Sequence, residues 1–349
     1  MADRYWVGGT GNWTSINTAN WSATSGGSGG ASVPTTSDKV YIDSNSGPAG
    51  AVITVPTFEI ANCYSFTKTV NIALAGVFGY LNVGNTSGGA NCGDYQDSGV
   101  SQTSIREIRF YGTTSGTPSV FSSTPSFAST SFFINQGSVD LGSNINSGTG
   151  IFYVTAGTTL DVTFRTVTCG FSIAGGATLV PTFATLTCFF WAIGSTASVA
   201  TNNISSLTIT GTSNTFSENR AGTQVYTNVT FGFFSNTTPT VISTVGNLTF
   251  NSVTLTGGGI SVPGGRQLSF NSFTVTQLSP NAVLTTPNPA STRFAISQVT
   301  GTALLNGLII SGCNATGGAT FIAGASSVDG GFNSGIQFVN SRGLLPMFT

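Results

Sequence analysis

The chain of 349 residues has a formal net charge of −1, and only 6% of its residues are charged, against about 25% in an ordinary globular domain. It has no basic cluster and no apolar run of about 18 residues, which argues against a nucleic-acid surface and against membrane insertion. Histidine is absent. This removes Ser-His-Asp and Cys-His catalysis and the commonest metal ligand, so we expect no cofactor and no metal site.

Residues 1–50 differ in composition from the rest of the chain. They carry three of the four tryptophans, a Gly/Ser tract at 25–32, and then a turn and a candidate strand at 32–43. A stack of strands exposes an edge and an apolar core at its open end, so one interpretation is a cap. Aromatic clusters are also favoured at interfaces and on sugar-binding surfaces, so the other interpretation is docking. The residues that would form this docking or glycan site are Trp6, Trp13, Trp21 and Tyr41.

The stretch YWVGGTGNW at 5–13, followed by NWS at 20–22 and VPTTSD at 33–38, resembles the opening of repetitive β-rich proteins of tailed bacteriophages. In that family, a glycine-rich β-helical body follows. The resemblance covers about the first 45 residues. It implies a virion protein of the tail-fibre or spike type, which assembles as a homotrimer and contacts other virion proteins and a host-surface glycan. The start MADRYW lacks the apolar stretch of a signal peptide, so we expect synthesis in the host cytoplasm and a place on the virion.

Four of the eleven carboxylates offer the only pairings that suggest chemistry. Asp94 and Asp97 lie close together in one loop, and Asp140 and Asp161 lie on neighbouring candidate coils. A glycosidase needs two carboxyl groups about 5–10 Å apart. Because scattered acids always offer some pair, we expect no enzyme, and a polysaccharide-degrading tailspike is the alternative.

A second charged cluster lies between these two acidic pairs. Arg106 and Arg109 flank Glu107 on one candidate strand. We interpret these residues as a surface ion pair of small energetic effect.

A repeat of about 20 residues organises the body of the chain, most clearly over residues 164–280. LTFNSVTLT at 248–256 recurs as LSFNSFTVT at 268–276, and TFRTVTC at 163–169 recurs as TFATLTC at 182–188. The shared six-residue unit is apolar, two variable residues, apolar, Thr, apolar. It starts at Phe164, Phe183, Ile204, Tyr226, Phe250 and Phe270, and its threonines are Thr168, Thr187, Thr208, Thr230, Thr254 and Thr274.

Apolar–Thr–apolar is strand alternation, with threonine outward and its neighbours inward. A recurring strand joined by Gly- and Asn-rich turns predicts one coil of a parallel β-helix, so the expected fold is an all-β solenoid with its body over 51–312. Stacked coils also explain the missing charge, because identical charges on neighbouring rungs repel. We expect interior stacks of Phe164 on Phe183 and of Phe250 on Phe270. An antiparallel sandwich is the structural alternative.

Further details follow from the same alignment. Asn251 and Asn271 should form an amide ladder. Looser copies start at Phe78, Ile105 and Leu305, where Asn82, Arg109 and Ile309 replace threonine. An ice-binding threonine lattice would need a second regular row, but the position two before each threonine is a mixture of Thr, Ser and Asn.

The cysteines, Cys63, Cys92, Cys169, Cys188 and Cys313, form no CxxC pair, so neither a disulfide framework nor a zinc site is predicted. Cys169 and Cys188 occupy equivalent places in two copies of the repeat, and we interpret them as buried thiols acting as small apolar residues.

Residues 313–349 lose the repeat and end in the apolar GLLPMFT. An exposed apolar tail is a liability, so we expect it to be buried against the body or a neighbouring subunit. The leading hypothesis is a bacteriophage structural protein, a rigid β-helical fibre, spike or appendage for host attachment. A capsid decoration protein is a further alternative.

Overall fold

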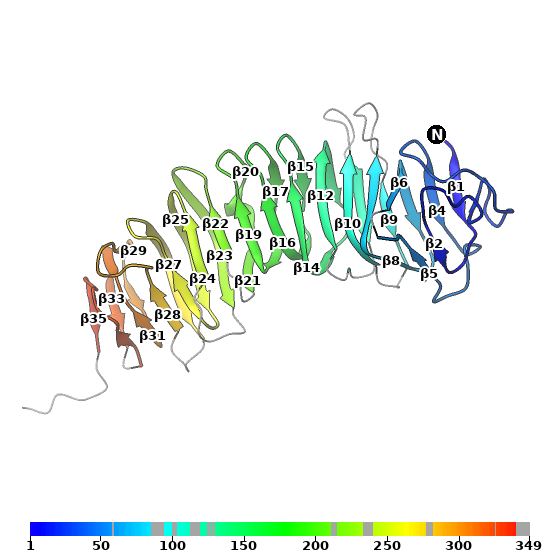
Figure 1. The fold of residues 1–349 in the computed structure, drawn as a ribbon. Helices are drawn as coiled ribbons and strands as arrows, with labels where there is room; N and C mark the ends of the chain where they lie inside the picture. Colours follow the sequence, from blue (N-terminus) through cyan, green and yellow to red (C-terminus); the bar gives the residue numbers. More distant parts are fainter. Residues whose placement is uncertain are drawn as a thin grey trace, which may run out of the picture. The chain divides into compact units, whose positions relative to one another are not determined.

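The computed structural model describes residues 1–57, 59–84, 94–99, 103–111, 119–123, 127, 130–210, 215–232, 240–276, 282–324 and 326–339. It confirms an all-β solenoid of parallel strands in turns of roughly 22 residues (Figure 1). The chain forms two compact units. Unit 1 contains Met1–Ala184 and Thr196–Ala200, and unit 2 contains Thr185–Ser195 and Thr201–Thr349.

One sheet of unit 1 holds ten strands among the described residues. In spatial order they are β20 (Ser198–Val199), β17 (Thr178–Val180), β15 (Thr159–Asp161), β13 (Ser138–Leu141), β11 (Ser119–Ser123), β9 (Tyr95–Asp97), β7 (Ser65–Lys68), β4 (Lys39–Ile42), β1 (Asp3–Trp6) and β3 (Trp21–Ser22). All neighbours in the described register are parallel except β1 and β3, which are antiparallel. The short reversed strand β3 therefore covers the edge at which the parallel stack begins.

The second sheet of unit 1 is built from β2 (Gly11–Asn12), β5 (Val52–Thr54), β6 (Ile60–Cys63), β8 (Ala73–Gly84), β10 (Thr103–Tyr111), β12 (Ser131–Gln136), β14 (Ile145–Val154) and β16 (Thr166–Ile173). Its inward residues stack on one another along the coils. The rings of Phe132 and Phe152 lie 4.5 Å apart, and those of Phe152 and Phe171 lie 5.7 Å apart. The two looser repeat copies share the predicted register at Arg109 and Asn82, but a register shift pairs Ile105 with Gly76 and not with the start of the other copy.

Unit 2 has three columns of parallel strands. The first contains β18 (Thr185–Cys188), β21 (Ser206–Thr210), β23 (Thr223–Gly232), β25 (Asn247–Leu255), β27 (Gln267–Val275), β29 (Phe294–Gln298) and β32 (Cys313–Gly317). The second contains β19 (Phe190–Ile193), β22 (Thr215–Glu218), β24 (Thr240–Thr244), β26 (Gly259–Ser261), β28 (Ala282–Thr285), β31 (Leu308–Ile310) and β34 (Val328–Asp329). The third contains β30 (Thr302–Leu304), β33 (Thr320–Ala323) and β35 (Ile336–Phe338), and a 3-10 helix, η1 (Thr201–Asn203), precedes β21.

The predicted repeat is present as stacked rungs in unit 2. Five of the six threonines form one column in register, namely Thr187, Thr208, Thr230, Thr254 and Thr274. Phe250 pairs with Phe270, and both are buried. The side-chain Nδ2 of Asn271 donates to Oδ1 of Asn251 at 3.1 Å, which confirms the amide ladder.

Two predictions about the repeat were wrong. Phe164 and Phe183 stack, but they lie on the outside of unit 1, because each sits in a turn before a strand rather than within one. The copy starting at Leu305 lies in another column, since its Ile309 pairs with Val283 of β28. Apolar spacing defines a strand but does not define the column in which that strand stacks.

The solenoid continues beyond the boundary predicted at residue 312. β32 pairs with β29, and β35 pairs with β33 through Phe338. The expected loss of the repeat at 313 was wrong, because these coils keep the pairing with small polar residues, such as Asn314 opposite Ser334. The segment GLLPMFT lies outside the described residues.

Candidate functional site

The tryptophans predicted for docking lie in the core of the first coil of unit 1. Trp6, Trp13 and Trp21 are buried. Trp21 packs edge-to-face against both other indoles, with ring centroids 5.1 Å from Trp6 and 4.9 Å from Trp13. Tyr41 is half-exposed and stacks on Tyr5 at 4.9 Å. Of the four predicted residues, Tyr41 is therefore the one whose ring reaches the surface.

The remaining residues of the opening stretch have structural roles in the same coil. The carboxylate of Asp38 accepts hydrogen bonds from the backbone of Ala2 at 3.1 Å and from the backbone and hydroxyl of Thr35 at 3.0 and 2.8 Å. Burial by itself would raise the pKa of Asp38, but these hydrogen bonds outweigh burial and lower it. A Cβ at Gly8 would meet the side chain of Asn20 at 2.5 Å. This stretch thus specifies the packing of the first coil.

Asp94 and Asp97 do not form the catalytic pair considered from the sequence. Asp97 forms an ion pair with Lys68 at 3.0 Å, and both side chains are fully buried. Lys68 also donates to the carbonyl of Ile72, and Asp94 accepts from the backbone of Val120 at 3.0 Å. Removing either partner of this buried pair would leave an uncompensated charge, and the Asp97 carboxylate has no exposed surface to offer a substrate.

The predicted ion pairs of Glu107 with Arg106 and Arg109 are present, but the carboxylate that they share is more buried than a surface pair implies. Glu107 is buried, and its carboxylate accepts two hydrogen bonds from Arg109, at 2.9 and 2.6 Å. The guanidinium of Arg109 also lies 4.3 Å from the centre of the Tyr80 ring. Stacking on this ring covers one side of the Arg109 guanidinium, while the Arg109 and Arg106 side chains stay 29% and 49% exposed.

Asp140 and Asp161 do converge. They are opposite each other in the register of β13 and β15, and both are half-exposed. Val120 precedes them in the same outward column, and Val180 follows. Burial, and secondly the charge of Asp161, raise the pKa of Asp140. A pair of neighbouring carboxyl groups is one requirement of acid–base chemistry on a sugar.

Phe164 follows Asp161 by three residues, and Phe183 holds the equivalent place one coil later, three residues after Val180. Both rings project outward. They are 70% and 63% exposed, and their rings stack with centroids 5.5 Å apart and planes 15° apart. Asp161 accepts a hydrogen bond from Thr163, which fixes the turn that carries the first ring. We call Asp140, Asp161, Phe164 and Phe183 the Asp–Phe corner.

The backbone at both phenylalanines is left-handed, with φ of 58° at Phe164 and 54° at Phe183. Each is the third residue of a tight turn closed by Arg165 N to Val162 O and by Ala184 N to Pro181 O, both at 3.0 Å. Such positions favour glycine, and another residue costs about 1–2 kcal/mol. Rings this exposed regain little of that energy by burial. Packing in the described part of the chain therefore does not explain why these two rings stand at the Asp–Phe corner.

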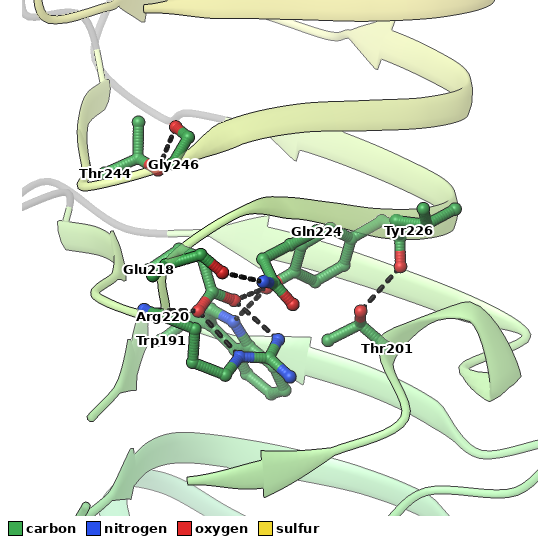
Figure 2. Close-up of polar contacts among 10 residues, drawn as sticks. Trp191, Thr201, Glu218, Arg220, Gln224, Tyr226, Thr244 and Gly246 are labelled. Atoms are coloured by element: carbon green, nitrogen blue, oxygen red, sulfur yellow. Dashed lines mark hydrogen bonds and ion pairs between the residues drawn. The ribbon is translucent and has the colours of Figure 1, made fainter. Parts of the chain in front are cut away.

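A buried polar network in unit 2 was not foreseen from the sequence (Figure 2). Glu218, at the end of β22, is fully buried and receives hydrogen bonds from Arg220 at 2.8 Å and from the hydroxyl of Tyr226 at 2.6 Å. Trp191 Nε1 donates to the same hydroxyl at 3.2 Å. Burial and the charge of Glu218 raise the pKa of Tyr226 well above its ordinary value. The network ties β19, β22 and β23 together. The only advance signal was the SENR sequence at 217–220 in a chain with few charges.

Cys169 and Cys188 are buried as predicted, and Cys63 and Cys313 are buried as well. Burial raises the pKa of Cys188 well above its ordinary value and that of Cys313 to about 12, so both remain thiols at neutral pH. Within the described ranges, no three Cys, Asp or Glu side chains gather where they would hold a metal ion. The part of the chain that the structure describes has no helix with the length and apolar character of a membrane span.

Comparison of the chain with models of protein families, with curated proteins and with solved structures gives no match.

Proposed function

We propose that this chain is a structural protein of a bacteriophage particle, a β-solenoid fibre, spike or appendage for attachment to the host surface. The observation that carries the proposal is the Asp–Phe corner, where Phe164 and Phe183 are held outward in an unfavourable backbone conformation on stacked coils. The resemblance of residues 5–38 to the opening of tailed-phage proteins supports the virion as its place.

The physical basis of this role is a stiff support with a small recognition surface. Each coil of a solenoid bonds to the next coil, so a contact surface is presented without a hinge. Two stacked rings offer flat apolar faces of the kind that pack on sugar rings, and neighbouring carboxylates accept hydrogen bonds from sugar hydroxyls. A host-surface glycan is therefore the proposed partner of the Asp–Phe corner.

An antibody to this chain, applied to purified particles and imaged by electron microscopy, tests the location. Label on the tail is the expected result, label on the capsid supports a decoration protein, and unlabelled particles contradict a virion role. Particles carrying Phe164→Ser and Phe183→Ser should assemble normally but adsorb to host cells several-fold more slowly. Particles carrying Phe332→Ser, another exposed phenylalanine with left-handed backbone, are the control.

A second function, polysaccharide cleavage, has one observation in its favour, namely the pair of Asp140 and Asp161 with a raised pKa at Asp140. Purified protein would be incubated with host capsule, and new reducing ends would be measured. Release that is lost in Asp140→Asn but kept in Asp3→Asn would establish an enzyme. Absence of release from the wild-type chain would leave attachment as the role of the corner.

A further inference from the structure

A pocket of about 330 Å³ opens on unit 2, apart from the Asp–Phe corner. It crosses the starts of four strands that follow one another in a single column, β25, β27, β29 and β32. Its polar lining consists of Arg266, Arg293, Asn247, Gln267, Asn314 and Ser334. A volume of this size lies at the small end of the range for ligand pockets, which is about 300–1,000 Å³.

Coil stacking brings the two arginines together. Arg266 and Arg293 are 27 residues apart in the sequence, but their coils are neighbours. The backbone N–H of Ala295 donates to the carbonyl of Arg266, and that of Gly265 donates to the carbonyl of Arg293, both at 2.7 Å. The two side chains therefore start about one rung apart, roughly 5 Å along the stack.

Like charges on neighbouring coils are unfavourable, and only 6% of the residues of this chain are charged. No carboxylate lines the pocket among the described residues. By contrast, Arg220 of the same unit is paired with Glu218 at 2.8 Å. Within the part of the chain that the structure describes, no carboxylate in the pocket neutralises the two arginines, so their charge is available to an anionic ligand.

The uncharged lining adds donors from two asparagines and an acceptor from Gln267, whose Nε2 is engaged in donating to Ser269 at 2.9 Å. The Oδ1 of Asn247 accepts from the backbone of Gln267 at 3.1 Å, and the Oδ1 of Asn314 accepts from Ser334 at 2.7 Å. Each asparagine therefore has its carbonyl engaged and presents its Nδ2 donor. Between Gln267 and Asn314 in the same column stands Ala295, whose short side chain leaves a depression between the longer amides.

We propose that this pocket binds an anionic oligosaccharide, with Arg266 and Arg293 holding a carboxylate or sulfate group and the amides holding ring hydroxyls. A guanidinium group can donate two parallel hydrogen bonds to a carboxylate or to a sulfate. The choice of a saccharide rests on the proposed attachment role, whereas the preference for an anion rests on the pocket alone.

Isothermal titration of the full chain with three short saccharides tests the proposal. The probes are trigalacturonic acid, a sulfated heparin disaccharide and neutral cellotriose. At least one anionic probe should bind, neutral cellotriose should not, and the two anionic probes distinguish carboxylate from sulfate. Arg293→Gln and Arg266→Gln should each weaken that binding by about 10- to 100-fold, the usual effect of losing a charged hydrogen bond. Lys39→Gln, which removes one cation outside the pocket, is the matched control.

Thermal unfolding of each variant verifies that it is folded. Arg293 is exposed, so Arg293→Gln should fold normally, and it provides the test if Arg266→Gln fails to fold. Binding of neither anionic probe, equal binding of cellotriose, or affinity unchanged in Arg293→Gln would overturn the proposal. The outcome is separable from the proposed function, because the titration uses the isolated chain. If the purified chain binds an anionic saccharide but is not found on particles, the pocket proposal stands and the virion role is rejected. If the chain is found on particles but binds no anionic saccharide, the virion role stands and the pocket proposal is rejected.

Discussion

Two pairs of phenylalanines occupy the same position of the repeat, yet one pair points into the core of its coils and the other points into solvent. In unit 2, Phe250 and Phe270 are 1% and 2% exposed. In unit 1, Phe164 and Phe183 are 70% and 63% exposed. Within each pair the two phenylalanines are one coil apart, so the difference in exposure does not arise from the stacking of the coils.

The difference arises from the backbone just before each ring. β25 runs without interruption from Asn247 to Leu255, so Leu248 and Phe250 both alternate inward. In unit 1, β15 ends at Asp161, and the ring of Phe164 follows in a left-handed turn. A turn residue does not obey strand alternation. A repeat in the sequence therefore identifies a coil, while the turn decides which way its first ring faces.

The largest expected effect of this comparison concerns the buried ring. Phe250→Ala should lower the free energy of unfolding by about 3–5 kcal/mol, because it removes a buried side chain and leaves a cavity. Phe164→Ala should change it by less than about 1 kcal/mol, because the ring is already in solvent. Chemical denaturation of both variants measures the contrast, and equal losses would contradict the assigned faces.

The turn that ends the opening stretch is expected to have the next largest effect. Asp38→Asn should destabilise the first coil by about 1.5–3 kcal/mol at neutral pH, since a charged acceptor of three hydrogen bonds is lost. The folded pKa is below the ordinary 3.8, so the stabilisation is present above that value and disappears as pH falls through the folded pKa. Denaturation at pH 7 and at pH 2 should show a difference between variant and wild type that shrinks in acid. A constant difference would argue against the charge as its source.

A smaller effect of opposite sign is expected at the outward ring. Phe164→Gly relieves the left-handed backbone and should raise the free energy of unfolding by up to about 1 kcal/mol, after the larger entropy of unfolded glycine is subtracted. Phe332→Gly in unit 2, where φ is 61°, should behave alike. A loss of stability in Phe164→Gly would mean that the stacked rings contribute to the fold.

The smallest expected effect concerns Asp140. Its raised pKa means that the folded state binds the proton more tightly, so stability falls as pH rises from the ordinary 3.8 through the folded value. Asp140→Asn should therefore stabilise unit 1 at pH 7 by a few tenths to about 1 kcal/mol, and it should remove this pH dependence. Asp161→Asn should give a similar gain, and the double variant should add little. Destabilisation at pH 7 would indicate an attractive contact instead.

The candidate site was only partly accessible from the sequence. The convergence of Asp140 and Asp161 followed from coil spacing, because residues one coil apart become neighbours. The buried positions of Trp6 and Trp21 could not be predicted, since a segment rich in aromatic residues is equally compatible with an exposed surface and with a core. The ion pair of Lys68 with Asp97 could be seen only in the structure, because the two residues lie on separate coils and the lengths of these coils could not be predicted from the sequence.

The sequence by itself determined that the chain is all-β and favoured a parallel β-solenoid over an antiparallel sandwich, because alternation within strands and recurrence near 20 residues can both be read without knowledge of the fold. It also determined the rung that joins Asn251 to Asn271. Only the tertiary structure decided that Phe164 faces outward, that the solenoid continues to Phe338, and that Arg266 meets Arg293 in one pocket. These outcomes depend on turn conformation and on which coils become neighbours, and both are set by the packing of the whole stack.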